Sequence, residues 1–255
     1  MPDASPFERV PVSEDRDSPW VLNDPMQTIG MLGGMSWESS AEYYRLANVL
    51  VRERVGGLHS AKVVLHSVDF AEIERMQVEG RWDDAGKVLA DAAAGVQAAG
   101  ADFLLICTNT MHKVYDQVQA AVDIPVVHLG DATATAIRNA GLTTVGLLGT
   151  GFTMDQPFYR ERLESHGLKV LVPSPEDRAT VHRIIYDELC LGIVREESRR
   201  AYQDVIARFE GVEGVILGCT EIELLISQAD VPLPVFPTTR LHVEAAVDRA
   251  VQANP

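Results

Sequence analysis

The residues of this chain best suited to chemistry follow an apolar run near its C-terminal end. Residues 214–217 read Gly-Val-Ile-Leu, which is typical of a buried strand, and Gly218, Cys219, Thr220 and Glu221 come next. In an open α/β sheet, a cysteine between a strand and a helix lies where sites form, and the unpaired N–H groups of the helix lower its thiol pKa. The alternative is a small cysteine packed in the core. A second site of the same kind would favour the reactive thiol.

Such a second site lies in the first half of the chain. The apolar residues 103–106 lead into Cys107, Thr108, Asn109 and Thr110, and a helical pattern follows. Two further pairs of segments match in the same order, 28–34 with 144–150 and 123–127 with 233–236. An internal repeat of this kind predicts two α/β lobes whose sites face each other across a cleft.

The order of strands and helices predicts an α/β fold. Apolar strands alternate with helices of about 10–15 residues, as in parallel sheets joined by right-handed crossovers. Helices are expected over residues 178–191 and 196–209, and Cys190 in the first of them is assigned to packing. The last helix, residues 239–252, either completes the second lobe or crosses back to the first, and periodicity does not decide between the two.

The first strand, residues 28–32, ends in a glycine turn. Gly33 and Gly34 follow it, and Ser36 or Ser39 is placed to cap the next helix. The N–H groups at this helix start suit a small anion such as a carboxylate. The glycine spacing is not that of a dinucleotide site, and no zinc pattern of cysteine and histidine occurs. The sequence therefore predicts neither a nucleotide cofactor nor a metal.

The composition is that of an acidic globular protein. The chain has 255 residues, of which 46% are hydrophobic, enough for one or two cores, and its formal charge is -15. Only 22 residues are Lys or Arg, which argues against a nucleic-acid surface. Three cysteines do not make a disulfide framework, so a reducing cytoplasm is expected. No apolar stretch of about 18 residues and no leader pattern occurs, so neither membrane spanning nor secretion is expected.

Residues 1–26 differ from the rest of the chain. They contain five prolines among charged residues and show little periodicity. Such a segment is expected to be a flexible N-terminal arm outside the repeated unit.

Two facing acid/base groups around one small cleft suit a reaction that takes a proton from one face of a carbon and returns a proton to the other. Racemisation and epimerisation are such reactions. A thiolate is a competent base when its pKa lies near the working pH, and N–H dipoles can hold a substrate carboxylate without a metal. The residues therefore predict an isomerase that needs no cofactor.

The sequence resembles the aspartate/glutamate racemase family, the cofactor-independent amino-acid racemases of the Asp/Glu/hydantoin racemase superfamily. Three motifs carry the resemblance: Gly-Gly-Met-Ser-Trp-Glu-Ser at 33–39, Thr-Asn-Thr-Met-His at 108–112 and Gly-Cys-Thr-Glu at 218–221. The resemblance implies two pseudo-symmetric Rossmann-like lobes with the active site between them, namely residues 27–137 with 236–255 and residues 138–235. It also implies a homodimer and one proton-transfer residue in each lobe.

One departure from the family concerns the first proton-transfer position. The usual motif reads Cys-Asn-Thr, whereas here Thr108 precedes Asn109, and Cys107 lies one place earlier. A one-residue offset along an extended segment points the side chain to the other face. Aligning the two strands by their last apolar residues pairs Thr108 with Cys219, whereas aligning the two Cys-Thr dipeptides pairs Cys107 with Cys219. The first alignment is favoured because the Asn-Thr pair sets the family register, which places the chain in the subset with threonine there.

The resemblance assigns roles to the site residues. Cys219 would be the thiolate base on one face of the α-carbon, and Thr108 would be the proton donor, or the anchor of a donating water, on the other. The residues expected to bind the substrate are Met35, Ser36, Gln77, Asn109, Thr110, Thr220, Glu221 and Arg178. Many relatives use a lysine near this arginine for the side-chain carboxylate of aspartate or glutamate, and Arg178 or His182 would replace it here.

Two other classes of function are compatible with the same residues. A relative with a single reactive thiol, of the arylmalonate decarboxylase or maleate isomerase kind, would also carry Cys219. A non-catalytic two-lobed protein that only binds a ligand would need no reactive thiol. Exchange of the α-proton of an amino acid with solvent deuterium separates the racemase from both.

Overall fold

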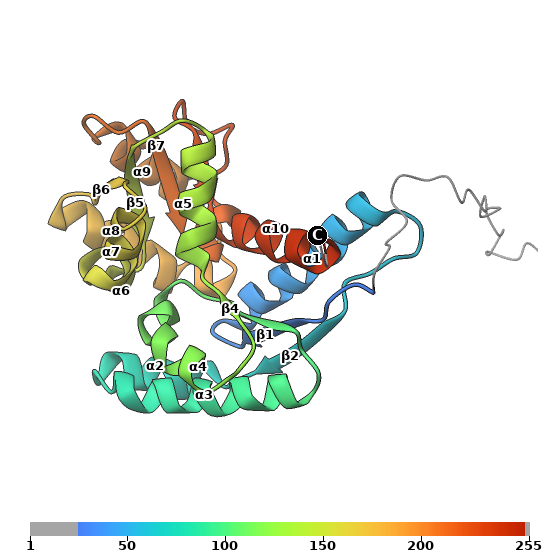
Figure 1. The fold of residues 1–255 in the computed structure, drawn as a ribbon. Helices are drawn as coiled ribbons and strands as arrows, with labels where there is room; N and C mark the ends of the chain where they lie inside the picture. The colour runs from blue at the N-terminus through green and yellow to red at the C-terminus, as the bar shows by residue number, and fades with distance from the viewer. Residues whose placement is uncertain (1–24, 253–255) are drawn as a thin grey trace, which may run out of the picture.

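The computed structural model describes residues 25–252, which form two parallel β-sheets covered by helices (Figure 1). The strands of the first sheet are β1 (Ile29–Gly33), β2 (Val63–Ser67), β3 (Phe103–Ile106) and β4 (Val126–Val127). Those of the second sheet are β5 (Thr144–Gly149), β6 (Lys169–Leu171), β7 (Gly214–Gly218) and β8 (Val235–Pro237). Apart from Pro25 and Met26, the predicted N-terminal arm lies outside the described residues.

The two sheets repeat one topology. Their strand orders are β2-β1-β3-β4 and β6-β5-β7-β8, and every pair of neighbouring strands is parallel. The three pairs of segments that match in sequence therefore occupy equivalent strands: β1 and β5, β3 and β7, β4 and β8. The predicted α/β fold with two lobes, each a short parallel sheet flanked by helices, is confirmed.

The helices alternate with the strands as the sequence predicts. In the first half they are α1 (Trp37–Val55), α2 (Phe70–Val78), α3 (Trp82–Ala98), α4 (Tyr115–Ala120) and α5 (Leu129–Asn139). In the second half they are α6 (Gly151–Asp155), α7 (Pro157–Glu164), α8 (Pro175–Asp187), α9 (Glu196–Ala207) and α10 (Thr238–Val251). Short 3-10 helices cover Thr110–Val114 (η1), Leu189–Leu191 (η2) and Thr220–Leu224 (η3).

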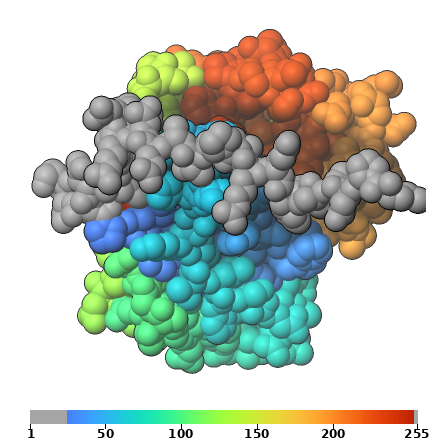
Figure 2. Space-filling view, turned by 90° about the vertical axis from the view of Figure 1, so that its right-hand side faces the viewer, coloured from blue at the N-terminus to red at the C-terminus, as the bar shows by residue number. Residues whose placement is uncertain are grey.

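Two helices cross between the lobes. Helix α5 follows β4 of the first sheet, but its Ile137 belongs to the same buried cluster as Val145 of β5. Helix α10 follows β8 of the second sheet, but its Val247 belongs to the same buried cluster as Tyr43 of α1. Figure 1 shows α5 beside β5 and β7 and α10 beside α1. In Figure 2 a yellow-green patch, which has the colour of the end of α5 and the turn after it, lies next to orange-red residues of the second lobe.

The packing of these two helices bears on the expected division of the chain into lobes. The sequence-based division counts residues 129–137 with the first lobe, whereas the apolar side of α5 is buried in the second core. The apolar side of α10 is buried in the first core. Each lobe thus ends in a helix that covers the sheet of the other lobe, because each apolar stripe packs on the surface that buries it.

A second difference concerns the region around Cys190. One helix is predicted over residues 178–191, but α8 ends at Asp187 and the separate turn η2 carries Cys190. Glu188, between the two, has a non-helical backbone with φ of -128° and ψ of -66°. The break bends the chain, and η2 then packs against η3, which follows Cys219.

The turn after β1 requires a glycine. Gly34 has a φ of +88°, and a Cβ at this position would collide with the carbonyl oxygen of Val68. Ser36 then caps α1, since its hydroxyl accepts a hydrogen bond from the backbone N–H of Ser39 at 3.2 Å. The predicted strand, glycine turn and capped helix are present, and Ser36 is the cap.

Candidate active site

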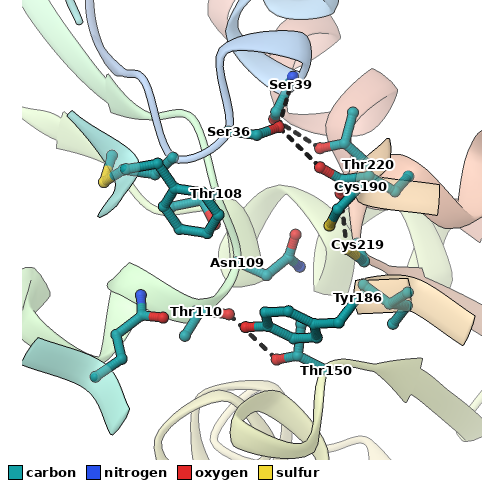
Figure 3. Close-up of a pocket in the computed structure, with 16 residues that line it drawn as sticks. Ser36, Ser39, Thr108, Asn109, Thr110, Thr150, Tyr186, Cys190, Cys219 and Thr220 are labelled. Carbon is teal, nitrogen blue, oxygen red and sulfur yellow. Dashed lines mark hydrogen bonds between the residues drawn. The ribbon is translucent and has the colours of Figure 1, made fainter. Parts of the chain in front are cut away.

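A pocket between the lobes lies at the carboxyl ends of β1, β3, β5 and β7 (Figure 3). Of the ten residues predicted for the site, nine line this pocket: Met35, Ser36, Gln77, Thr108, Asn109, Thr110, Cys219, Thr220 and Glu221. Carboxyl ends of parallel strands meet at one edge of a sheet, and here the edges of two sheets face each other. The pocket therefore collects residues that lie far apart in the chain, such as Ser36 and Glu221, which are 185 positions apart.

Cys219 and Glu221 form a thiol–carboxylate pair in the second lobe. The Cys219 thiol donates a hydrogen bond to Oε2 of Glu221 at 2.8 Å. The other carboxylate oxygen, Oε1, accepts a hydrogen bond from the Ser36 hydroxyl of the first lobe at 2.9 Å. Glu221 is only 7% exposed. Both lobes thus hold the Glu221 carboxylate in place, and one of its oxygens accepts the hydrogen bond from the thiol.

The acidity of this thiol differs from the sequence-based expectation. Proximity to a helix N-terminus predicts a lowered thiol pKa, but burial and the negative charge of Glu221 raise the pKa of Cys219 well above its usual value. The segment after Cys219 is a 3-10 helix of five residues rather than a long α-helix. In this structure Cys219 is a neutral thiol with a proton acceptor already in contact.

Thr108 occupies in the first sheet the position that Cys219 occupies in the second. Leu32 of β1 pairs with Ile106, and Leu148, the equivalent residue of β5, pairs with Leu217. Thr108 and Cys219 each lie two residues beyond these paired positions. Figure 3 shows Thr108 on the left of the pocket and Cys219 on the right, with Asn109 between them.

Cys107 points away from the pocket. Its side chain is 0% exposed and belongs to the core cluster between β1, α1 and α10. Burial raises the pKa of its thiol far above the usual value. Cys107 and Thr108 are adjacent in an extended segment, so their side chains point to opposite faces, as the sequence predicts.

Asn109 presents an unpaired donor. Its Oδ1 accepts a hydrogen bond from the Thr238 hydroxyl at 3.2 Å, which orients the amide. The side chain is buried, with 4% exposed, and its Nδ2 has no hydrogen-bond partner among the described residues. Because an unpaired buried N–H group is costly, this one is suited to a ligand acceptor such as a carboxylate oxygen.

Hydroxyl groups from both lobes surround the amide. Thr110 of the first lobe and Thr150 of the second approach each other with 3.2 Å between their Oγ1 atoms. Thr220 contacts the Ser39 hydroxyl at 2.8 Å and accepts a hydrogen bond from Thr239 at 3.0 Å. These interlobe contacts hold the two walls of the pocket together and supply further donors for an anion.

His112 holds the backbone of Thr108 from behind the pocket. Its Nε2 accepts a hydrogen bond from the Leu129 N–H at 3.1 Å, so its proton lies on Nδ1, which donates to the Thr108 carbonyl at 2.8 Å. Burial lowers the pKa of His112 to about 4. Because Leu129 begins α5, the neutral ring ties Thr108 to the helix that crosses between the lobes.

Arg178, the tenth predicted residue, does not line this pocket. Its guanidinium lies 2.6 Å from the Asp155 carboxylate and donates to the Pro173 carbonyl at 2.9 Å. His182 accepts a hydrogen bond from the Gly151 N–H through Nδ1 at 3.0 Å. Both residues line a separate hollow on the second lobe, with Phe152 and Pro175.

Several pocket residues were not predicted. They are Ser39, Phe70, Thr150, Ile185, Tyr186, Cys190 and Gly218. Ser39 belongs to the first motif, which indicated it. Thr150 follows β5 as Gly34 follows β1, so the repeat indicated Thr150. Ile185, Tyr186 and Cys190 reach the pocket from α8 and η2, and no spacing along the chain indicates that approach. Cys190, which the sequence assigned to packing, lines the pocket as well as contacting the core.

Metal-binding groups do not gather in the described part of the chain. Residues 25–252 contain no cluster of three or more His, Cys, Asp and Glu side chains placed to hold a metal ion. No helix in this range is both long and apolar enough to span a membrane.

The family model for Asp/Glu/hydantoin racemases matches residues 32–246, which covers all the pocket residues named above and every strand except the first residues of β1. The chain belongs to this family. A putative Asp/Glu racemase from Yersinia pestis has a similar crystal structure, with 52% identity, a TM-score of 0.84, and coverage of 89% of this chain and 100% of that one. An aspartate racemase homologue from Pyrococcus horikoshii follows with 36% identity, a TM-score of 0.79, and coverage of 88% and 99%.

Two characterised types of racemase match shorter stretches. The broad specificity amino-acid racemase RacX of Bacillus subtilis is 29% identical over 89 residues, which is 35% of this chain and 39% of RacX. A glutamate racemase of Streptococcus pyogenes is 30% identical over 122 residues, which is 47% of this chain and 44% of that enzyme. These matches span less than half of either relative. Membership of the family supports racemase activity in general, without naming the amino acid.

Proposed function

We propose that this protein is a cofactor-independent amino-acid racemase that uses Cys219 and Thr108 as an unequal proton-transfer pair. The observation that carries the proposal is the register of the two sheets, which brings these two residues to equivalent strand ends around one pocket. A racemase needs one group on each face of the α-carbon. We thereby assign the chain to the subset of the family with threonine at the first position.

The substrate α-carboxylate is assigned to the amide and hydroxyl donors between the pair. Asn109 offers its unpaired Nδ2, and Thr110 and Thr220 lie on either side of it. Preorganised donors at this place also stabilise the negative charge that develops on the carboxylate when the α-proton leaves. The carboxylate of Glu221 attracts the α-ammonium group of the incoming substrate.

Glu221 is assigned to activate the thiol. The proton of the Cys219 S–H bond passes along the 2.8 Å hydrogen bond to the carboxylate, which leaves a thiolate and a neutral carboxylic acid. The thiolate then takes the α-proton, so the S–H bond forms again as the C–H bond breaks. A proton returns to the carbanion from the other face, from the Thr108 hydroxyl or a water that it holds. The alkoxide or hydroxide left there is reprotonated as the Glu221 carboxylic acid gives its proton back through water, which restores the starting state. A hydroxyl is a far weaker acid than a thiol. The rates of the individual proton-transfer steps therefore differ between the two directions of the reaction.

Proton NMR in deuterium oxide tests the proposal. Purified protein incubated with single L-amino acids should remove the α-proton signal of at least one of them and form its D-enantiomer, with no added pyridoxal phosphate, nucleotide or metal. Exchange that appears only after a cofactor or a divalent ion is added would contradict the mechanism. Tight binding of amino acids without exchange would instead identify a two-lobed binding protein.

A single-thiol decarboxylase has less support. An arylmalonate decarboxylase variant matches this chain with 12% identity and a TM-score of 0.52, which indicates a shared fold alone.

We also propose, from the family, that the protein is a homodimer and that it is located in the cytoplasm. Sedimentation of the purified protein tests the first of these two statements.

A further inference from the structure

The described residues that line the pocket include no lysine and no arginine. Their one formally charged side chain is Glu221, whose carboxylate is negative. An amino-acid zwitterion has one negative and one positive group. The donors near Asn109 can bind its carboxylate, and Glu221 can bind its ammonium group. Aspartate and glutamate bring a second carboxylate, which needs a cation or several donors of its own.

Two arginines that line neighbouring hollows are already engaged. Arg178 forms an ion pair with Asp155 at 2.6 Å and lies on a different hollow. Arg45 makes two hydrogen bonds to Glu42, each 2.7 Å long. Neither guanidinium is directed to the pocket by a contact with any residue that lines it.

Lys113 follows the first motif closely, but it too is held elsewhere. Its Nζ lies 3.9 Å from the centre of the Trp82 ring, where the face of the indole attracts the ammonium group. The ring of Trp82 in turn packs edge-on against Phe152 of the second lobe, with 5.7 Å between their centres. The lysine that comes directly after His112 therefore serves the seam between the lobes.

Part of the pocket wall is apolar or uncharged. Phe70 comes from the first lobe, and Ile185, Tyr186 and Cys190 come from α8 and η2 of the second. Ile185 is only 1% exposed and belongs to the core of the second lobe. Tyr186 stacks on His182 with 4.7 Å between ring centres, and its hydroxyl makes no hydrogen bond to another described residue. A substrate side chain that meets this wall loses water and gains no opposite charge.

Building on the proposed racemase activity, we infer that the substrate is an α-amino acid with an uncharged side chain rather than aspartate or glutamate. A second carboxylate in this pocket would lose its solvation without gaining a counter-charge. An amide or an apolar chain of the same length carries no such cost. Neutral substrates are thus selected by the absence of a counter-charge on the wall that faces their side chain.

The sharpest test compares substrates of equal shape and different charge. Rates of α-proton exchange in deuterium oxide should be measured for L-glutamine against L-glutamate and for L-asparagine against L-aspartate, with L-methionine and L-leucine as apolar members of the set. We expect kcat/KM for each amide to exceed that of its acid by about tenfold or more. A smaller or reversed ratio would overturn the inference while leaving the racemase intact. No exchange with any of the six would overturn the proposed function together with the inference.

A designed cation provides an independent readout. Tyr186→Lys places an ammonium group on the uncharged wall near the C-terminal end of α8, where the helix dipole favours it. Tyr186→Met has a side chain of similar length without charge and serves as the matched control. Relative to Tyr186→Met, Tyr186→Lys should shift the ratio of glutamate to glutamine exchange towards glutamate by about tenfold. Equal ratios in the two variants, with both folded, would count against the missing counter-charge as the cause.

Discussion

The thiol of Cys219 donates a hydrogen bond to the carboxylate of Glu221, two residues further along the chain, at 2.8 Å. Cys219 has an extended backbone at the end of β7, and the 3-10 turn η3 that begins with the next residue brings Glu221 back to the thiol. Ser36 of the opposite lobe holds the other carboxylate oxygen. The proton acceptor of the thiol is therefore supplied by the same short motif as the thiol and is fixed in place across the lobe boundary.

Replacing Cys219 by serine should remove α-proton exchange. The hydroxyl has nearly the same shape but does not ionise near neutral pH, so the loss should be about 10²- to 10⁴-fold or more for every substrate. Exchange is followed by proton NMR in deuterium oxide. The thermal midpoint should stay within a few degrees of the parent, which separates loss of chemistry from loss of fold. Undiminished exchange in a folded variant would remove Cys219 from the site.

Glu221→Gln should separate the acidity of the thiol from turnover. The negative carboxylate raises the pKa of Cys219, so its removal should shift the pH midpoint for alkylation of this thiol by iodoacetamide downwards. Turnover should nevertheless fall, by about 10²-fold, because the proton acceptor is gone. Mass spectrometry of the Cys219 peptide follows alkylation, so the signal of the other cysteines does not interfere. A lower midpoint with unchanged turnover would show that Glu221 perturbs the thiol without accepting its proton.

Thr108→Cys should make the two directions of the reaction more alike. The enantiomer whose α-hydrogen faces Thr108 should exchange slowly in the parent, and a second thiol should speed that exchange. The equilibrium between enantiomers stays equal, because a catalyst lowers both barriers of a step alike. From the threonine-bearing subset of the family, the L-enantiomer is expected to be the fast one. The measurement is deuterium exchange of each pure enantiomer.

Cys107→Ala is the matched control for that experiment. Its thiol lies in the first core with 0% exposed, so the change should cost about 1 kcal/mol of stability and leave exchange of both enantiomers in place. If Cys107→Ala abolished exchange of one enantiomer and Thr108→Cys had no effect, Cys107 would be the second base.

Stability should fall in mild acid because of buried histidines. The pKa of His112 is lowered to about 4 and that of His242 to about 3, against 6.5 for an ordinary histidine. The unfolded chain therefore binds these protons first, so the neutral rings favour the folded state above about pH 6.5 and this advantage is lost as the pH falls towards the folded pKa values. Burial likewise lowers the pKa of His128 to about 2. Each of the three histidines contributes up to about 1.4 kcal/mol per pH unit, so the free energy of unfolding should fall by several kcal/mol between about pH 7 and about pH 5.

Urea unfolding at the two pH values measures this difference, and His242→Gln is its control. The His242 ring contacts the Tyr43 hydroxyl at 2.9 Å and the Val127 carbonyl at 2.9 Å, and glutamine can both accept and donate there. The variant should lose about a third of the pH dependence. A pH dependence equal to that of the parent would assign the acid sensitivity to the carboxylates.

The sequence by itself determined the repeated unit and most of the pocket. Strand and helix periods are local properties, so matching segments in the same order indicated two equivalent sheets, and strand ends carrying Cys219 and Thr108 had to meet where the carboxyl edges face each other. The Asn-Thr pair also indicated the register that separates Thr108 from Cys107. Nine predicted site residues lie around one pocket for this reason.

Only the tertiary structure decided what surrounds them. Which sheet a helix covers depends on distant apolar surfaces, so α5 and α10 exchange lobes although each follows a strand of its own lobe. The break between α8 and η2 brings Tyr186 and Cys190 to the pocket, while Arg178, on the same helix, pairs with Asp155 outside it. Helical spacing says which residues share a face, but the partner of that face, and hence the charge of the substrate pocket, is set by packing between segments far apart in the chain.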